Sequence, residues 1–164
     1  MALQVIFIIV ALFTLGSAIG AVVARNLFHA ALFLVGTFAG VAVFYVLLQA
    51  EFLAVSQVVV YIGAIATLII FAIMLTRSVM GKEAGSLNSY AWFVAIASAL
   101  MVAALVWLFS VVKFDINPQP VPDDAIAQIG EGFVTAYVIP FEVASVMLLV
   151  ALIGAIMLAR ERHQ

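Results

Sequence analysis

Long apolar runs separated by short polar segments make up most of this 164-residue sequence. A helix that crosses a membrane needs about 20 consecutive, mostly apolar residues. Five runs reach that length, so the pattern predicts an all-α integral membrane protein with five transmembrane helices in a single membrane domain, residues 1–164. The predicted spans cover approximately residues 3–24, 29–48, 52–76, 90–112 and 140–159.

The amino-acid composition supports this membrane class and excludes others. Hydrophobic residues make up 68% of the chain and charged residues 9%, whereas a typical soluble domain is about half apolar and about a quarter charged. The net charge of −2 argues against a nucleic-acid partner, because few basic groups are present to neutralise phosphates. The lack of cysteine excludes disulfides, thiolate-held iron–sulfur clusters and cysteine zinc sites.

Basic residues collect on one side of the predicted spans. An odd number of spans places the two termini on opposite sides of the membrane. The five basic residues of the first side are Arg25, Arg77, Lys82, Arg160 and Arg162. The other side holds only Lys113. Because short cytoplasmic loops are rich in Lys and Arg, we expect the N-terminus outside and the C-terminus in the cytoplasm.

The longest polar connection, residues 113–139, is predicted to lie on the outer side. Its three prolines, Pro118, Pro120 and Pro122, favour extended and turn conformations over helix. Its second half, "DDAIAQIGEGFVTAYVI", predicts a short helix at the membrane interface, capped by Asp123 or Asp124.

Known catalytic constellations are absent from the sequence. No Ser or Thr has a nearby His–Asp pairing, and no glycine-rich phosphate loop occurs. The two histidines, His29 and His163, lie at predicted helix ends without metal-ligand spacing. We therefore predict no catalytic residue and no metal site, and any function must come from groups within or beside the spans.

Small residues recur at four-residue spacing in three of the predicted spans. The pairs are Gly16 with Gly20, Gly36 with Gly40, and Gly63 with Thr67. Such spacing places two small residues on one helix face, where another helix backbone can approach closely. The pattern predicts tight helix packing, in a protein that is itself packed among many helices.

Two acidic residues lie near span ends on the predicted outer side. Glu51 precedes the third span, and Glu142 follows Pro140 at the start of the fifth. Proline suits the first position of a helix, and a carboxylate in the first turn complements the helix dipole. The alternative for both residues is a contact with a partner chain or with water, since carboxylates within a membrane are commonly functional.

Tyr61 is the anomalous polar residue of the third predicted span. At about 1.5 Å per residue it lies about 15 Å from either interface, too deep for the interfacial aromatic belt. One interpretation is a buried tyrosine that is hydrogen-bonded to a neighbouring helix, and the other is a hydroxyl in a chain of water molecules. Three β-branched valines precede it and Gly63 follows it, and this combination permits a π-bulge.

These residues carry a resemblance to a known family. The segment "EFLAVSQVVVYIGAIATLIIFAIML" resembles the third helix of the J-type subunit of proton-pumping NADH:quinone oxidoreductase, respiratory complex I, called chain 6 in mitochondria. "YVIPFEVASVMLLVALIGAIMLAR" resembles the last helix of that family, and "RNLFHAALFLV" resembles the start of its second helix. The residues that match in the third helix are Phe52, Leu53, Gln57, Val60, Tyr61, Gly63 and Ala64.

The resemblance implies a core membrane subunit of the complex in a bacterial plasma membrane. Its partners would be the quinone-proximal, A-type and K-type membrane chains, with lipids around them. It would bind no cofactor itself, and quinone, FMN and iron–sulfur clusters would lie elsewhere in the complex. The resemblance also implies a π-bulge at about Val60–Thr67, including Tyr61, Gly63 and Ala64, which changes between π and α forms and gates or lines a water path for protons.

Other assignments remain open at this point. Similar chains occur in ferredoxin-dependent complexes, membrane-bound hydrogenases and multisubunit cation/proton antiporters. A stand-alone small transporter would need a polar path through its own spans, which the sequence does not offer. A subunit with a purely structural packing role is a further alternative.

Overall fold

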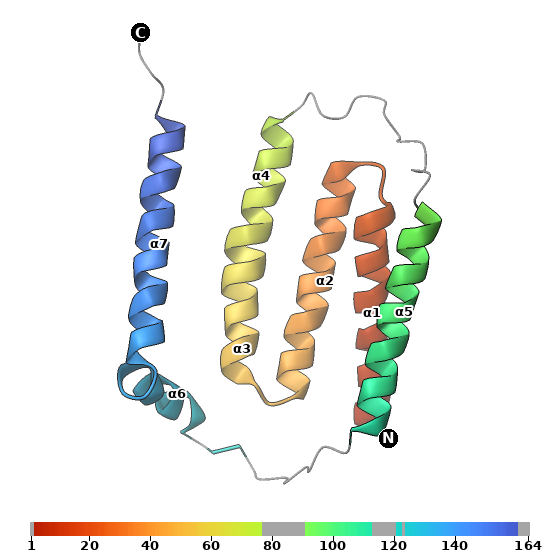
Figure 1. Ribbon diagram of the computed structural model, residues 1–164, viewed down its shortest axis with the longest axis horizontal. Helices are drawn as coiled ribbons and strands as arrows, with labels where there is room; N and C mark the ends of the chain where they lie inside the picture. Colours follow the sequence, from red (N-terminus) through yellow and green to blue (C-terminus); the bar gives the residue numbers. More distant parts are fainter. Residues whose placement is uncertain (1, 77–90, 113–120, 123, 161–164) are drawn as a thin grey trace. The chain divides into compact units, whose positions relative to one another are not determined.

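The computed structural model describes residues 2–76, 91–112, 121, 122 and 124–160 of the chain (Figure 1). Eight residues named above lie outside the described residues, as does the first position of the predicted span 90–112. The eight are Arg77, Lys82, Lys113, Pro118, Pro120, Asp123, Arg162 and His163. The chain divides into two compact units, Met1–Pro118 and Gln119–Gln164. Each unit is described by itself.

Among the described residues, five helices are long and apolar enough to cross a membrane, which confirms the predicted all-α fold with five spans. Apolar side chains satisfy the bilayer core, and the helical backbone satisfies its own N–H and C=O groups there. The spans are α1 (Ala2–Val23), α2 (Leu27–Leu47), a continuous helix over Glu51–Leu75, α5 (Ala91–Val111) and α7 (Val138–Ala159). The third span consists of α3 (Glu51–Ser56), η1 (Gln57–Ala66) and α4 (Thr67–Leu75).

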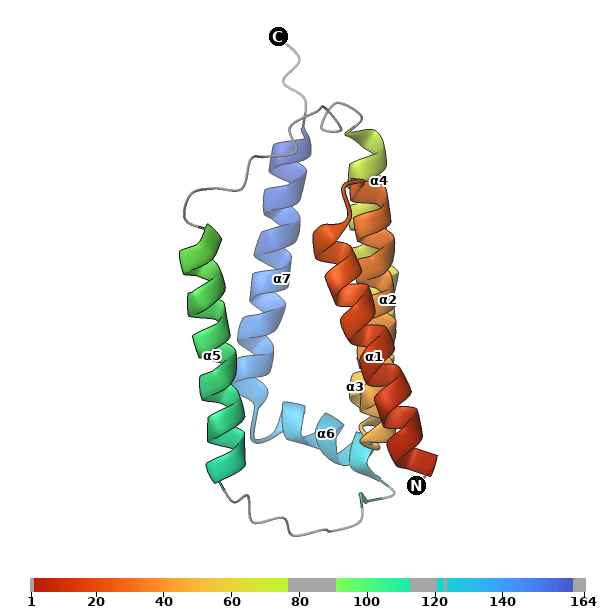
Figure 2. The same cartoon turned by 90° about the vertical axis from the view of Figure 1, so that its right-hand side faces the viewer.

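In the first unit, α2 lies between α1 and the third span (Figure 1, Figure 2). The turn from α1 to α2 is short because Asn26 begins α2 directly: its side-chain oxygen accepts a hydrogen bond of 2.9 Å from the Phe28 N–H. This is the usual way in which an Asn N-cap satisfies a free helical donor. The cap starts α2 two residues before the predicted start at His29.

A tight turn at residues 48–50 connects α2 to α3. The Gln49 N–H donates to the Val46 carbonyl and the Ala50 N–H donates to the Tyr45 carbonyl, which is the Schellman pattern of a helix C-terminus. Gln49 has a φ of 57°, in the left-handed region that usually holds glycine. The turn brings the third span back alongside α2.

Glycines at the α1–α2 interface allow the two helices to approach closely. A methyl group on Gly20 would lie 2.8 Å from the Phe33 ring, and one on Gly36 would lie 3.0 Å from the Ser17 hydroxyl oxygen. A methyl group on Gly40 would overlap Thr14, whose Cβ would be 2.9 Å away. Three of the five glycines predicted for packing therefore lie in this interface. At Gly16, apart from its chain neighbours and the nearby backbone of its own helix, no described atom lies within 4 Å of such a group.

The second unit contains α6 (Ala125–Val134) and α7 (Figure 2). Figure 2 shows α6 lying crosswise at the start of α7, and the Phe133 and Phe141 rings stack with centroids 5.7 Å apart. Asp124 occupies the N-cap position of α6, but its carboxylate accepts a hydrogen bond of 2.9 Å from the Gln128 side chain instead of a backbone N–H.

The start of α7 differs from the prediction. The helix begins at Val138, so Pro140 is its third residue and not its first. The missing N–H of Pro140 is still among the first four donors, which have no partner within a helix. Glu142 is consequently the fifth residue and lies beyond the first turn, so the expected interaction with the helix dipole is weaker than predicted.

Candidate functional site: a π-helical segment in the third span

The middle of the third span is a π-helix, η1, over Gln57–Ala66. The predicted π-bulge is therefore present, although it begins three residues before Val60 and ends one residue before Thr67. Branched side chains at residues 58–60 crowd the preceding turn of an α-helix. A wider π turn relieves this crowding, so the local sequence and the observed backbone agree.

Gly63 lies at the centre of η1. A methyl group added there would lie 3.4 Å from the carbonyl oxygen of Val58, five residues earlier, which is an ordinary van der Waals distance. Apart from its chain neighbours and the nearby backbone of its own helix, no other atom of the described residues would lie within 4 Å of it. Among the described residues, Gly63 is therefore not required for close packing. Glycine also lowers the helix propensity at this point of the span.

Thr67 closes the π segment at its C-terminal end. Its hydroxyl donates a 3.2 Å hydrogen bond to the carbonyl of Ile62, five residues earlier. Its backbone N–H donates to the carbonyl of Ala64, three residues earlier. Thr67 therefore makes two hydrogen bonds at the junction where the π-helix η1 ends and the α-helix α4 begins.

Tyr61 projects from η1 beside α2. Its ring meets Phe38 of α2 edge-on, with centroids 5.5 Å apart and an interplanar angle of 75°. The side chain is 46% exposed in the isolated chain, and its hydroxyl makes no hydrogen bond to the described residues. A hydroxyl at this depth needs a partner, because lipid tails supply none. Within the described residues, then, α2 supplies an aromatic contact to Tyr61 and no hydrogen bond.

The rest of η1 has a buried side and an exposed side. Gln57 and Ala66 are buried, with 6% and 2% of their surface exposed, and η1 packs on α2. The predicted site residues Val60, Gly63 and Ala64 are exposed, as is Thr67. Large exposed apolar surface is expected in a membrane, so exposure alone does not distinguish lipid from a neighbouring subunit.

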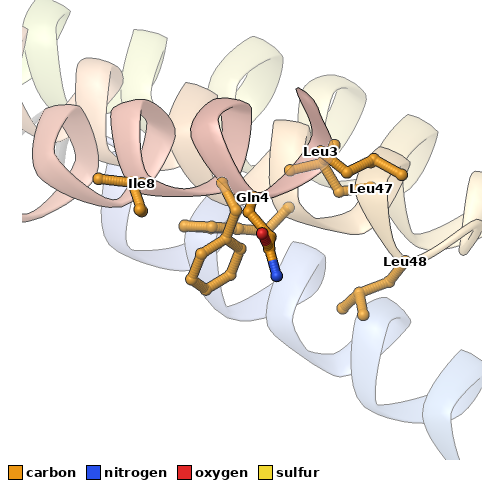
Figure 3. Close-up of a pocket in the computed structure, with 7 residues that line it drawn as sticks. Leu3, Gln4, Ile8, Leu47 and Leu48 are labelled. Atoms are coloured by element: carbon orange, nitrogen blue, oxygen red, sulfur yellow. The ribbon is translucent and has the colours of Figure 1, made fainter. Parts of the chain in front are cut away.

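Two apolar pockets of the first unit are lined in part by residues of α2. One, of about 500 Å³, lies between α2 and the third span and is lined by Ala39, Ala42, Val43, Val46, Ala54, Val55, Val58, Val59 and Ile62. The other, of about 620 Å³, lies between the start of α1 and the end of α2. Figure 3 shows Leu3, Gln4 and Ile8 of α1 opposite Leu47, the last residue of α2, and Leu48, which follows it. Gln4 is the polar side chain of this second lining.

Charged side chains are confined to span ends in the described spans. Glu51 is the first residue of α3 and lies in its first turn, whereas Glu142 is the fifth residue of α7. Both are exposed, and neither forms part of a cluster of His, Asp and Glu that could hold a metal ion among the described residues. The described spans therefore carry no Asp, Glu, Lys or Arg in their middle.

Comparisons with known proteins place these features in a family. A family model for NADH-ubiquinone/plastoquinone oxidoreductase chain 6 matches residues 17–158. The chain belongs to this family. NAD(P)H-quinone oxidoreductase chain 6 of Synechocystis sp. is 38% identical over 159 residues, which cover 94% of this chain and 79% of that protein. The same chain of Leptolyngbya boryana is 40% identical over 158 residues, covering 94% and 78%.

A relative from a different enzyme complex has similar identity. The F420H2 dehydrogenase subunit J of Methanosarcina mazei is 38% identical over 158 residues, covering 94% of this chain and 89% of that protein. The chain 6 match includes the whole third span and α7 up to Leu158. Family membership therefore agrees with the resemblance seen in the third span and in α7.

The absence of cysteine limits which cofactors this chain 6 member can hold. Iron–sulfur clusters in such complexes are ligated mainly by cysteine thiolates, and this chain has none. The residues present do not fit such a group. This chain therefore has no thiolate ligand for such a cluster.

Sequence reasoning missed two features of the π site. Phe38 was not recognised as the ring that contacts Tyr61, because the pairing of α2 with η1 is a tertiary contact. Thr67 was predicted as a small packing residue and as the end of the bulge, but the bond from its hydroxyl to the backbone was not predicted. The available signal was a Thr placed four residues after Gly63 in an otherwise apolar run.

Proposed function

We propose that this chain is a membrane subunit of a quinone-reducing respiratory complex that couples electron transfer from NAD(P)H to quinone with proton movement. The observation that carries the proposal is the combination of chain 6 family membership with a π-helix around Tyr61 and Gly63. In this role the chain performs no redox step. The chain contributes η1, which gates or lines a path for water and protons.

The gating mechanism follows from helix geometry. A π segment contains one residue more per turn than the α form allows, and removing that excess rotates the following helix by about 100°, the angle per residue of an α-helix. Such a rotation moves Tyr61 relative to the residues beyond η1. The hydroxyl of Tyr61 can donate one hydrogen bond and accept others, so its position decides whether water molecules line up beside the span.

The proposal also includes the neighbouring subunits of this chain and the sides of the membrane on which its termini lie. The exposed residues of η1 would meet the K-type chain, and other spans would meet the quinone-proximal and A-type chains in a bacterial plasma membrane. The N-terminus would be outside and the C-terminus in the cytoplasm, since Arg25 and Arg160 follow α1 and α7 on one predicted side.

Purification of the intact complex by a tag on this chain tests the subunit function. We expect the complex to reduce quinone with NADH or NADPH, and mass spectrometry to find flavin- and cluster-binding subunits. Reduction with F420H2 alone would favour the alternative donor, which the 38% identity to the M. mazei subunit supports. Isolation of this chain without redox subunits would contradict the proposal.

The orientation is checked in the same cells, because the natural chain has no cysteine. A membrane-impermeant thiol reagent should label Ala2→Cys in intact cells and Gln164→Cys only after permeabilisation. The reverse pattern would invert the proposed orientation.

A further inference from the structure

Several Ser and Thr hydroxyls donate hydrogen bonds to backbone carbonyls earlier in the chain. The bond of Thr67 spans more residues than the others. Five hydroxyls donate to the carbonyl four residues earlier, at 2.7–3.0 Å; they belong to Thr14, Thr37, Thr76, Ser110 and Thr135. Ser145 reaches three residues back, to Glu142. Thr67 reaches five residues back, to Ile62, at 3.2 Å. This bond has the span of a π turn and not of an α turn.

The bond is specific to one form of the helix. In an α-helix the carbonyl four residues earlier lies within reach of a Thr hydroxyl, and the carbonyl five residues earlier lies a further 1.5 Å or so along the axis and turned by about 100°. If η1 became α-helical, the Thr67 hydroxyl would turn to Gly63, as Thr37 turns to Phe33. The Ile62 carbonyl would then take the ordinary backbone donor of an α-helix, the Ala66 N–H.

The Thr67 hydroxyl stabilises the π form and the α form to different extents, because its hydrogen bond has a different role in each. At the end of η1 the Thr67 N–H donates to the Ala64 carbonyl and the Thr67 hydroxyl donates to the Ile62 carbonyl, so the two donors of this residue serve two different carbonyls. In the α form both donors would reach the same carbonyl, that of Gly63, and the hydroxyl would only duplicate a backbone bond. Its loss therefore destabilises the π form more than the α form.

We propose that the Thr67 hydroxyl is a latch that favours the π form of η1 by bonding the Ile62 carbonyl. This inference rests on the proposed gating function, since a latch has consequences only if the segment adopts both forms. It adds a named side chain that sets the balance between them. Thr67 acts through the backbone and is a positioning residue.

The test compares variants of the complete, purified complex by high-resolution electron cryo-microscopy. Thr67→Val removes the hydroxyl and keeps the shape, Thr67→Ala is a second hydroxyl-free variant, and Thr67→Ser keeps the hydroxyl. Thr37→Val is the matched control, because it removes a hydroxyl that bonds four residues back in α2. The readout is the ratio of particles with a π-helical η1 to particles with an α-helical η1.

We expect Thr67→Val and Thr67→Ala to lower this ratio about fivefold, the effect of losing one net hydrogen bond, while Thr67→Ser and Thr37→Val leave it unchanged. An unchanged ratio in both hydroxyl-free variants would overturn the latch. An equal shift in Thr67→Ser or Thr37→Val would also overturn it. Proton movement per quinone reduced is measured on the same samples: a changed ratio with unchanged proton movement keeps the latch and refutes the gate.

Discussion

Tyr61 is the residue on which the proposed chemistry depends. Its ring is held by Phe38 at 5.5 Å, while its hydroxyl makes no hydrogen bond to the described residues. Tyr61→Phe keeps the ring contact and removes only the hydroxyl. We therefore expect normal assembly and electron transfer with fewer protons moved per quinone reduced, measured in vesicles that contain the purified complex.

Tyr45 supplies the control for that substitution. It lies near the end of α2, outside η1, so Tyr45→Phe should leave the coupling ratio unchanged. Equal coupling in Tyr61→Phe and wild-type complexes would remove the Tyr61 hydroxyl from the mechanism. It would leave the backbone of η1 as the only moving part.

The identities of single residues allowed us to predict that the third span is unusual around Tyr61. They did not allow us to predict which residues make contacts there. The depth of Tyr61 and the glycine after three valines are properties of the printed sequence, and they indicated a deformable helix. The reach of Thr67 to Ile62 and the position of Phe38 depend on the local turn and on helix pairing. Neither has a periodic signature in one sequence, so neither could be predicted.

At the scale of helices, apolar run length was a sufficient guide. The observed spans begin and end within about two residues of the predicted ones, because charged and polar residues end each run where the bilayer core ends. The Asn26 cap accounts for the early start of α2. The start of α7 at Val138, before Pro140, has no side-chain cap. The π register was less predictable, since branched residues and glycine permit several starting points.

The pairing of α1 with α2 makes a specific prediction. Gly40 faces Thr14 so closely that Gly40→Ala should destabilise the pair by about 1–3 kcal/mol through overpacking. Thr14→Gly removes the atoms that the new methyl group would meet, so the double variant should recover part of that loss. The measurement is the thermal stability of this chain within the purified complex.

Gly16 provides the matched control for Gly40. Apart from its chain neighbours and the nearby backbone of its own helix, no atom of the described residues lies within 4 Å of a methyl group placed there, so Gly16→Ala should have little effect on stability. Equal losses for Gly16→Ala and Gly40→Ala would contradict the specific role of the Gly40–Thr14 contact. A double variant no more stable than Gly40→Ala would contradict it as well.

At the scale of the molecule, the first unit and the second unit both present mainly apolar surface. The buried residues of the described chain are few and small, with Ala31, Ala42, Ala54 and Ala66 as the apolar ones. A chain with so small an internal core is expected to be held by lipid and by neighbouring helices. Family membership supplies a complex in which such neighbours exist.

The central claim is that η1 changes between π and α forms while the complex works. The most direct measurement is electron cryo-microscopy of the purified complex at rest and during turnover with its electron donor and quinone. We predict a π-helix over Gln57–Ala66 in one population and an α-helix in another, with Tyr61 displaced between them and the proportions changed by turnover. A π-helix in every population, unchanged by turnover, would contradict the account.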